Sequence, residues 1–215
     1  MSGFFKTANR ACSYRCPMER VDLLAGVLTK TGDLVEGVGA DQLSLPTPCP
    51  DYDVEALVDH LVGWLLLFES GCHDRSYDGD PGRHRCGADP AAEFRAAAGG
   101  LVAGWERYGF DREVAVTGSR TLPAETVFNM TLMEYMTHGW DLAVATGRPA
   151  PFTEEEAAEA LTRAQATLPP QYRGENMPFG EIVPVDENAP AVERLVAFLG
   201  REPRFSPSVP APDGS

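Results

Sequence analysis

Apolar residues recur every three to four positions along most of the chain, a spacing that is typical of amphipathic α-helices. Between the third and fourth of the helices that this pattern predicts, a short apolar stretch at 114–116 favours an extended segment instead. The pattern therefore predicts a mainly helical protein with six helices, over residues 19–36, 54–70, 90–105, 123–145, 153–168 and 189–199.

Residues that cap or interrupt helices lie at the ends of the predicted segments. Three prolines within residues 45–50 exclude a helix there, because proline lacks the backbone donor, and Asp51 or Asp53 can cap the helix that follows. Thr153 with Glu156 matches a capping box, in which each side chain accepts a hydrogen bond from the backbone N–H of the other residue. These signals support the helix boundaries that the apolar spacing predicts.

The predicted helices form one domain. With 215 residues, 43% of them hydrophobic, the chain is long enough to bury a core. Helices separated by polar loops favour an all-α fold, a four-helix bundle with additional short elements. We place this domain at residues 18–205, between a disordered N-terminal extension at 1–17 and a disordered tail at 206–215. Within the domain, residues 71–87 are polar and rich in glycine, and we expect an exposed, mobile loop there.

The composition excludes several classes of partner. Thirty-two acidic residues against 18 basic ones give a formal net charge of −14, which repels nucleic acids and anionic lipid surfaces. The best apolar run, 61–68, is far shorter than the roughly 20 residues that cross a bilayer, and residues 1–17 lack the apolar core of a secretory signal. Five cysteines without a regular framework indicate reduced thiols, so we expect a cytoplasmic protein with no nucleic-acid or membrane partner.

A carboxylate and an imidazole lie four residues apart on the predicted helix 123–145. At 3.6 residues per turn, Glu134 and His138 fall within about 40° of each other on one face, so both can hold one ion. His60 lies beside the apolar stripe of helix 54–70, where bundle cofactor sites are built, and is the third candidate ligand. Two histidines and one carboxylate suit a divalent ion such as zinc and leave a fourth position for water or substrate. A surface Glu–His pair and a hydrogen-bonded core histidine remain alternatives, which spacing alone does not exclude.

The remaining histidines and two further cysteines give weaker signals. Cys72, His73, His84 and Cys86 fall in or at the edge of the predicted loop 71–87, where no helical frame holds them. We interpret them as solvated loop residues without a metal.

Several stretches of the sequence carry motifs that resemble a known family. The most specific are the proline-rich segment leading to Asp-His-Leu-Val-Gly, and Glu-x-x-x-His-Gly-Trp-Asp-Leu-Ala with Thr-Gly-Arg-Pro behind it. Together they resemble the mycothiol-dependent maleylpyruvate isomerase family, in an actinobacterial subfamily, over roughly residues 18–205. The motifs occupy residues 46–50, 59–63, 134–143, 146–149, 178–180, 189–190 and 199–201.

The resemblance implies a fold and a set of ligands. The family's metal-binding N-terminal domain is a DinB-like four-helix bundle, and its metal, usually taken to be zinc, is held by a histidine on the second helix and by a glutamate and a histidine on a later one. Those positions match His60, Glu134 and His138. Asp141, one turn beyond His138, is then expected either to orient the ligand imidazole as a hydrogen-bond acceptor or to pack between helices.

The resemblance also implies a chemistry, with one departure. The characterised isomerase carries an additional C-terminal domain that contributes to its active site. We expect this chain to lack a full copy of it, so neither the isomerase reaction nor a catalytic arginine is transferred.

The leading hypothesis is a mycothiol-dependent thiol transferase or isomerase, in which the metal activates the small-molecule thiol toward an electrophilic substrate. A non-catalytic metal-binding protein and a metal-dependent hydrolase remain alternatives. We also consider a homodimer.

Overall fold

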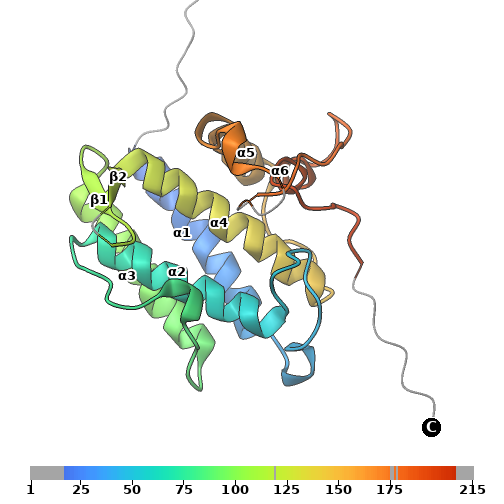
Figure 1. Cartoon of the computed structure of the whole chain (residues 1–215), viewed down its shortest axis with the longest axis horizontal. Helices are drawn as coiled ribbons and strands as arrows, with labels where there is room; N and C mark the ends of the chain where they lie inside the picture. Colours follow the sequence, from blue (N-terminus) through green and yellow to red (C-terminus); the bar gives the residue numbers. More distant parts are fainter. Residues whose placement is uncertain (1–16, 119, 175–176, 178, 207–215) are drawn as a thin grey trace, which may run out of the picture.

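Six α-helices account for most of the described chain, and four of them form a bundle. The computed structural model describes residues 17–206, apart from residues 119, 175–176 and 178. In the bundle, the first and second helices each contact both the third and the fourth, and the last two helices pair with each other and lie against the fourth (Figure 1). The helices are α1 (Pro17–Glu36), α2 (Val54–Cys72), α3 (Pro90–Tyr108), α4 (Ala124–Ala145), α5 (Glu154–Thr167) and α6 (Ala191–Phe198).

Local signals in the sequence explain where the central helices begin. The Asp53 side chain accepts a hydrogen bond from the backbone N–H of Ala56 at 2.9 Å and caps α2, and Asp89 caps α3 in the same way ahead of Pro90. The apolar stripes of the four bundle helices meet in one core. Its largest fully buried side chains are Trp105, Tyr135, Phe94 and Phe128.

A polar contact inside this core fixes α4 against α2. The buried Tyr135 hydroxyl donates a hydrogen bond to the backbone oxygen of Leu61 at 3.1 Å. Leu61 is itself fully buried. Because an unpaired buried hydroxyl would cost about 1–3 kcal/mol, this bond favours one longitudinal position of α4 along α2.

Short elements complete the fold, and one of them differs from the prediction. The extended stretch expected at 114–116 is a strand, β1 (Glu113–Ala115), which pairs antiparallel with a second strand, β2 (Thr121–Pro123). The prediction missed β2 because three residues directly before a helix show no alternation of their own. Three single 3₁₀ turns, η1 (Ala40–Gln42), η2 (Pro81–Arg83) and η3 (Pro170–Tyr172), were also missed.

The segment predicted as a loop at 71–87 is partly anchored. Helix α2 continues through Cys72, which is buried, so placing this cysteine in a loop was wrong. Residues 74–80 are mostly exposed, as expected, but Pro81 is buried against α2. The contact requires a glycine on the helix, because a Cβ atom at Gly63 would lie 2.4 Å from the Pro81 carbonyl oxygen. The mobility of the segment stays a prediction.

The mainly helical, DinB-like four-helix bundle with additional short elements is confirmed. The domain boundaries stay a prediction, since the expected disordered ends at 1–17 and 206–215 fall almost wholly outside the described residues. In the part of the chain that the structure describes, no helix combines the length and apolar character needed to cross a membrane.

Helix α5 is joined to the bundle through one carboxylate with two roles. Glu156 accepts a hydrogen bond from the backbone N–H of Thr153 at 2.8 Å, completing the predicted capping box, and also accepts from Lys30 Nζ of α1 at 2.7 Å. Burial by itself would raise the pKa of Glu156, but these contacts lower it below its usual value of 4.5. The carboxylate therefore stabilises the fold in its charged form.

We expect Glu156→Gln to lower the free energy of unfolding by about 1 kcal/mol at pH 7, because the partly exposed ion pair with Lys30 is lost while the cap acceptor remains. A lowered folded-state pKa contributes stability above pH 4.5 that is lost as the pH falls through it, so the difference from wild type shrinks in acid. Urea denaturation at pH 7 and below pH 4 measures both effects. The exposed Glu187→Gln control is expected to change stability by under about 0.5 kcal/mol, and an equal Glu156→Gln effect at both pH values would contradict the prediction.

Candidate metal centre

Helices α2 and α4 bring the three predicted ligand residues together. His60 Nε2 lies 2.6 Å from Glu134 Oε1, and His138 Nε2 lies 3.6 Å from the same oxygen. The two imidazole rings are 4.9 Å apart between centroids, and one ligand atom from each of the three residues lies within 4.8 Å of the others. The convergence expected from the sequence is therefore present, and metal binding by these residues stays a prediction.

The packing of neighbouring residues determines this convergence. His60 follows Leu57 by three residues on α2 and lies one residue before Leu61, and both leucines are fully buried. On α4, the residue after His138 is Gly139, where a Cβ atom would lie 2.7 Å from the Phe152 ring and 2.9 Å from Thr31 Oγ1. A glycine therefore allows close packing behind His138 and holds this turn of α4 in place.

The donor distances fit a shared divalent ion, with one adjustment. Two nitrogen or oxygen donors about 2.1 Å from a tetrahedral ion are about 3.4 Å apart. The 3.6 Å between His138 and Glu134 matches this separation. The 2.6 Å between His60 and Glu134 is a hydrogen-bond distance, so this pair must separate before both atoms can ligate.

The charge of the cluster also suits a cation. Burial alone would raise the pKa of Glu134, but His138, His60 and Arg201 outweigh it and lower the pKa to about 2. The carboxylate is therefore negative at neutral pH, although its side chain retains only 24% of its exposure.

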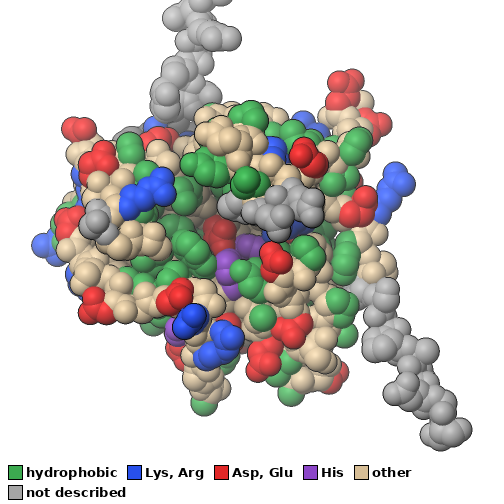
Figure 2. Space-filling model, in the orientation of Figure 1, with side chains coloured by type: hydrophobic (Ala, Val, Ile, Leu, Met, Phe, Trp, Pro, Cys, Tyr) green, Lys and Arg blue, Asp and Glu red, His purple; other side chains and the backbone are tan. Residues whose placement is uncertain are grey.

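The centre lies in a hollow that is accessible from one face. Figure 2 shows histidine side chains beside a carboxylate at the bottom of a depression in the middle of this face, surrounded by hydrophobic residues. His60 and His138 retain 11% and 9% of their side-chain exposure. Both imidazoles are therefore largely covered, and a small part of each stays exposed.

Asp141 contacts the imidazole that it was expected to orient. Its Oδ2 atom lies 2.9 Å from His138 Nδ1, and the whole side chain is buried. When Nδ1 carries the ring proton and donates a hydrogen bond to Asp141, the unprotonated Nε2 faces Glu134 and can act as a ligand atom. Of the two roles open in the sequence, this geometry favours the orienting one.

Arg201 is a buried member of the cluster that the sequence analysis did not assign. It lies beyond the end of α6, is 9% exposed, and its Nη2 atom is 3.3 Å from Asp141 Oδ2. The turn that delivers it requires a glycine, because Gly200 has φ of +86° and a Cβ there would lie 2.7 Å from the Gly180 Cα. The Leu-Gly-Arg motif at 199–201 was noted only as part of the resemblance, and no local pattern indicates that this arginine is buried.

Two residues near the proline-rich segment were also missed. Cys49 is buried, and its sulfur forms a second close group with donor atoms of His138 and Asp141. The Tyr52 ring lies 4.6 Å from the His60 ring between centroids, and burial raises the pKa of Tyr52 to about 12. The phenol is therefore protonated at neutral pH. The motif at 46–50 drew attention to this region, but the spacing of its residues does not predict that Cys49 or Tyr52 lies beside the histidines.

The sequence was compared with known families, proteins and structures. The family described as the mycothiol maleylpyruvate isomerase N-terminal domain matches residues 24–143, which include His60, Glu134 and His138. Two uncharacterised proteins, from two strains of Mycobacterium tuberculosis, are each 32% identical over 179 residues that cover 80% of this chain and 91% of theirs. No solved structure gives a significant match.

We expect Asp141→Asn to lower the free energy of unfolding by about 3 kcal/mol, because Arg201 then stays buried without its counter-charge. The double variant Asp141→Asn/Arg201→Met should lose at least about 1 kcal/mol less than the sum of the single losses, since no uncompensated charge remains. Chemical denaturation of wild type, Asp141→Asn, Arg201→Met and the double variant gives the coupling free energy between the two side chains. Asp78→Asn, in an exposed segment, is the control. Additive losses would show that the two groups do not act as a pair.

Proposed function

The chain belongs to the family of the mycothiol maleylpyruvate isomerase N-terminal domain, and on that premise we propose that it is a metal-dependent enzyme using mycothiol as a cosubstrate. The resemblance drawn from the motifs is confirmed at the level of the family. We assign the divalent ion, most simply zinc, to His60, Glu134 and His138, and the reaction to thiol transfer or thiol-assisted isomerisation of an electrophilic substrate.

The observation that carries the proposal is the number of protein ligands. Among the described residues, no fourth histidine, cysteine or carboxylate joins the group formed by His60, Glu134 and His138. Cys49 groups with His138 and Asp141 instead. Structural zinc sites are closed by four protein ligands, whereas catalytic sites keep a position open. Three ligands without a fourth protein donor therefore favour an enzyme over a non-catalytic metal-binding protein.

The ligand set suits activation of a thiol. A bound ion of this type deprotonates a coordinating thiol near neutral pH. The thiolate sulfur would then form a bond to an electrophilic carbon while that carbon's π bond, or its bond to a leaving group, gives up its electron pair, and the thiol proton would pass to solvent; thiol transfer and thiol-assisted isomerisation share this step. Asp141 keeps the His138 ring in one orientation through a hydrogen bond. Arg201 neutralises the charge of Asp141, so neither side chain is available to pair with the thiolate sulfur in place of the ion.

The charges around the centre balance when ion and thiolate are present. Glu134 and one thiolate supply two negative charges against a divalent cation, while Asp141 and Arg201 form a neutral pair. A net charge near zero reduces the cost of removing these groups from water. A second anionic thiol would upset this balance, which favours one thiol per centre.

We expect each of His60→Ala, Glu134→Gln and His138→Ala to lose one equivalent of bound zinc relative to wild type, because two remaining ligands hold the ion weakly. Elemental analysis after dialysis against a weak chelator measures the difference. His73→Ala is the matched control: His73 lies at the far end of α2, bonds the Gly100 carbonyl, and should leave the metal content unchanged. Wild-type zinc content in all three variants would remove the proposed centre.

We expect mycothiol to add a thiolate-to-metal charge-transfer band to the cobalt-substituted protein, because its sulfur would occupy the open position. Difference absorption spectra over a thiol titration measure it. S-methylated mycothiol, which cannot form a thiolate, and cobalt-loaded His60→Ala are the controls and should show no new band. An unchanged spectrum at saturating mycothiol would exclude sulfur ligation and favour the hydrolase alternative, in which the ion activates water.

A further inference from the structure

A second set of metal-binding side chains lies outside the centre described above. His84 and Cys86, from the segment before α3, meet Glu93 of α3, and one ligand atom from each lies within 4.8 Å of the others. We propose that these three residues form a second divalent-cation site, suited to zinc. It shares no ligand with the first site and does not depend on the function proposed above.

The distances within the cluster suit an ion better than a hydrogen bond. His84 Nε2 is 3.5 Å from Glu93 Oε2, close to the separation of about 3.4 Å expected for two donors on one tetrahedral zinc ion. The Nε2 atom is buried, yet it has no hydrogen-bond partner. A buried polar atom without a partner costs about 1–3 kcal/mol, and an ion between the two groups would satisfy it.

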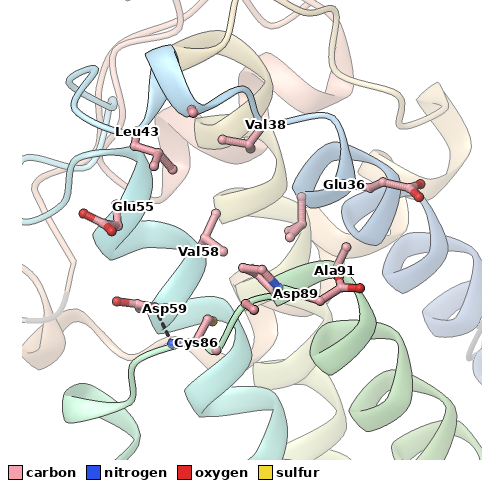
Figure 3. A pocket seen from close by; sticks show the side chains of 14 residues that line it. Glu36, Val38, Leu43, Glu55, Val58, Asp59, Cys86, Asp89 and Ala91 are labelled. Carbon is pink, nitrogen blue, oxygen red and sulfur yellow. Dashed lines mark hydrogen bonds between the residues drawn. The ribbon is translucent and has the colours of Figure 1, made fainter.

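The backbone around the three ligands is already held in place. Glu93 uses its other oxygen, Oε1, to accept a hydrogen bond from the Gly87 N–H at 2.6 Å. The Cys86 N–H donates to Asp59 Oδ1 of α2 at 2.8 Å, the contact drawn as a dashed line in Figure 3. These bonds fix Cys86 and Glu93 before any ion arrives, which lowers the ordering cost of binding.

The electrostatic surroundings of the site attract cations. The carboxylates of Glu93 and Asp59 lie beside His84 and the Cys86 backbone. They would attract a divalent ion, and the thiol proton would pass to solvent when the sulfur binds it. Arg85 is the basic residue paired with Asp59 here, at 3.4 Å, and its side chain is largely exposed.

A pocket adjoins one ligand of the site, Cys86. The pocket has a volume of about 440 Å³, and Cys86 and Asp59 lie on its wall (Figure 3). Other carboxylates line it as well, namely Glu36, Glu55 and Asp89. An acidic pocket beside Cys86 concentrates cations rather than anionic substrates.

An ion bound at this site would also cross-link elements of the fold. An ion on His84, Cys86 and Glu93 would fasten the segment before α3 to α3, while Asp59 ties the same segment to α2. A mixed sulfur, nitrogen and oxygen donor set selects zinc over magnesium or calcium, which prefer oxygen ligands alone.

The test loads the full chain with cobalt or zinc. Every protein in it carries Cys12→Ser and Cys16→Ser, so that the N-terminal thiols cannot bind the metal and produce a charge-transfer band of their own. Without added thiol, the cobalt protein should show a thiolate charge-transfer band. Cys86→Ser should reduce cobalt affinity of this site at least about tenfold and abolish the band. Glu93→Gln should lower bound zinc by one equivalent.

Matched controls separate the second site from the first. Cys49→Ser should retain the band, because Cys49 belongs to the group around His138, and His60→Ala should retain it while losing the first equivalent of zinc. Far-UV circular dichroism confirms that each variant is folded. An unchanged band in Cys86→Ser together with unchanged zinc content in Glu93→Gln would overturn the second site and leave the first unaffected.

Discussion

The Tyr135 hydroxyl of α4 donates a hydrogen bond to the Leu61 carbonyl of α2 inside the buried core, and the placement of the candidate centre depends on this contact. Glu134 precedes Tyr135 and His60 precedes Leu61, so the bond that sets the two helices also sets the two ligand-bearing residues. A buried bond tolerates little sliding, because its loss leaves the Tyr135 hydroxyl unpaired in the core.

The C-terminal third of the chain completes the centre from outside the segment that defines the family. The family match ends at residue 143 and includes Asp141, whereas Arg201, which neutralises Asp141, lies beyond it. Helices α5 and α6 carry this arginine to the bundle, and Glu154 of α5 accepts a hydrogen bond from the Ala191 N–H at the start of α6. In this fold the additional helices therefore contribute an electrostatic partner as well as apolar cover.

Helix α2 serves two clusters at once. Asp59 and His60 are neighbours in sequence and point in directions about 100° apart on a helix. His60 faces Glu134 of α4, while Asp59 holds the Cys86 backbone ahead of α3. A rigid helix shared in this way couples the position of the 74–87 segment to that of the centre. The coupling is mechanical, because the two clusters share backbone rather than ligands.

The sequence by itself determined the helices, their caps, the bundle class and the Glu134–His138 pair, since periodicity, capping and i,i+4 spacing are local properties of the chain. The position of His60 beside an apolar stripe made it the third candidate ligand, and the family motifs supported that assignment. Only the tertiary structure decided that Arg201 is buried against Asp141, that Cys49 and Tyr52 lie beside the histidines, and that His84, Cys86 and Glu93 meet. Those contacts join residues far apart in sequence or in irregular segments, and depend on glycines such as Gly63, Gly139 and Gly200 whose close approaches no local pattern reveals. A side chain's neighbours are set by how helices pack, and packing is a property of the whole chain.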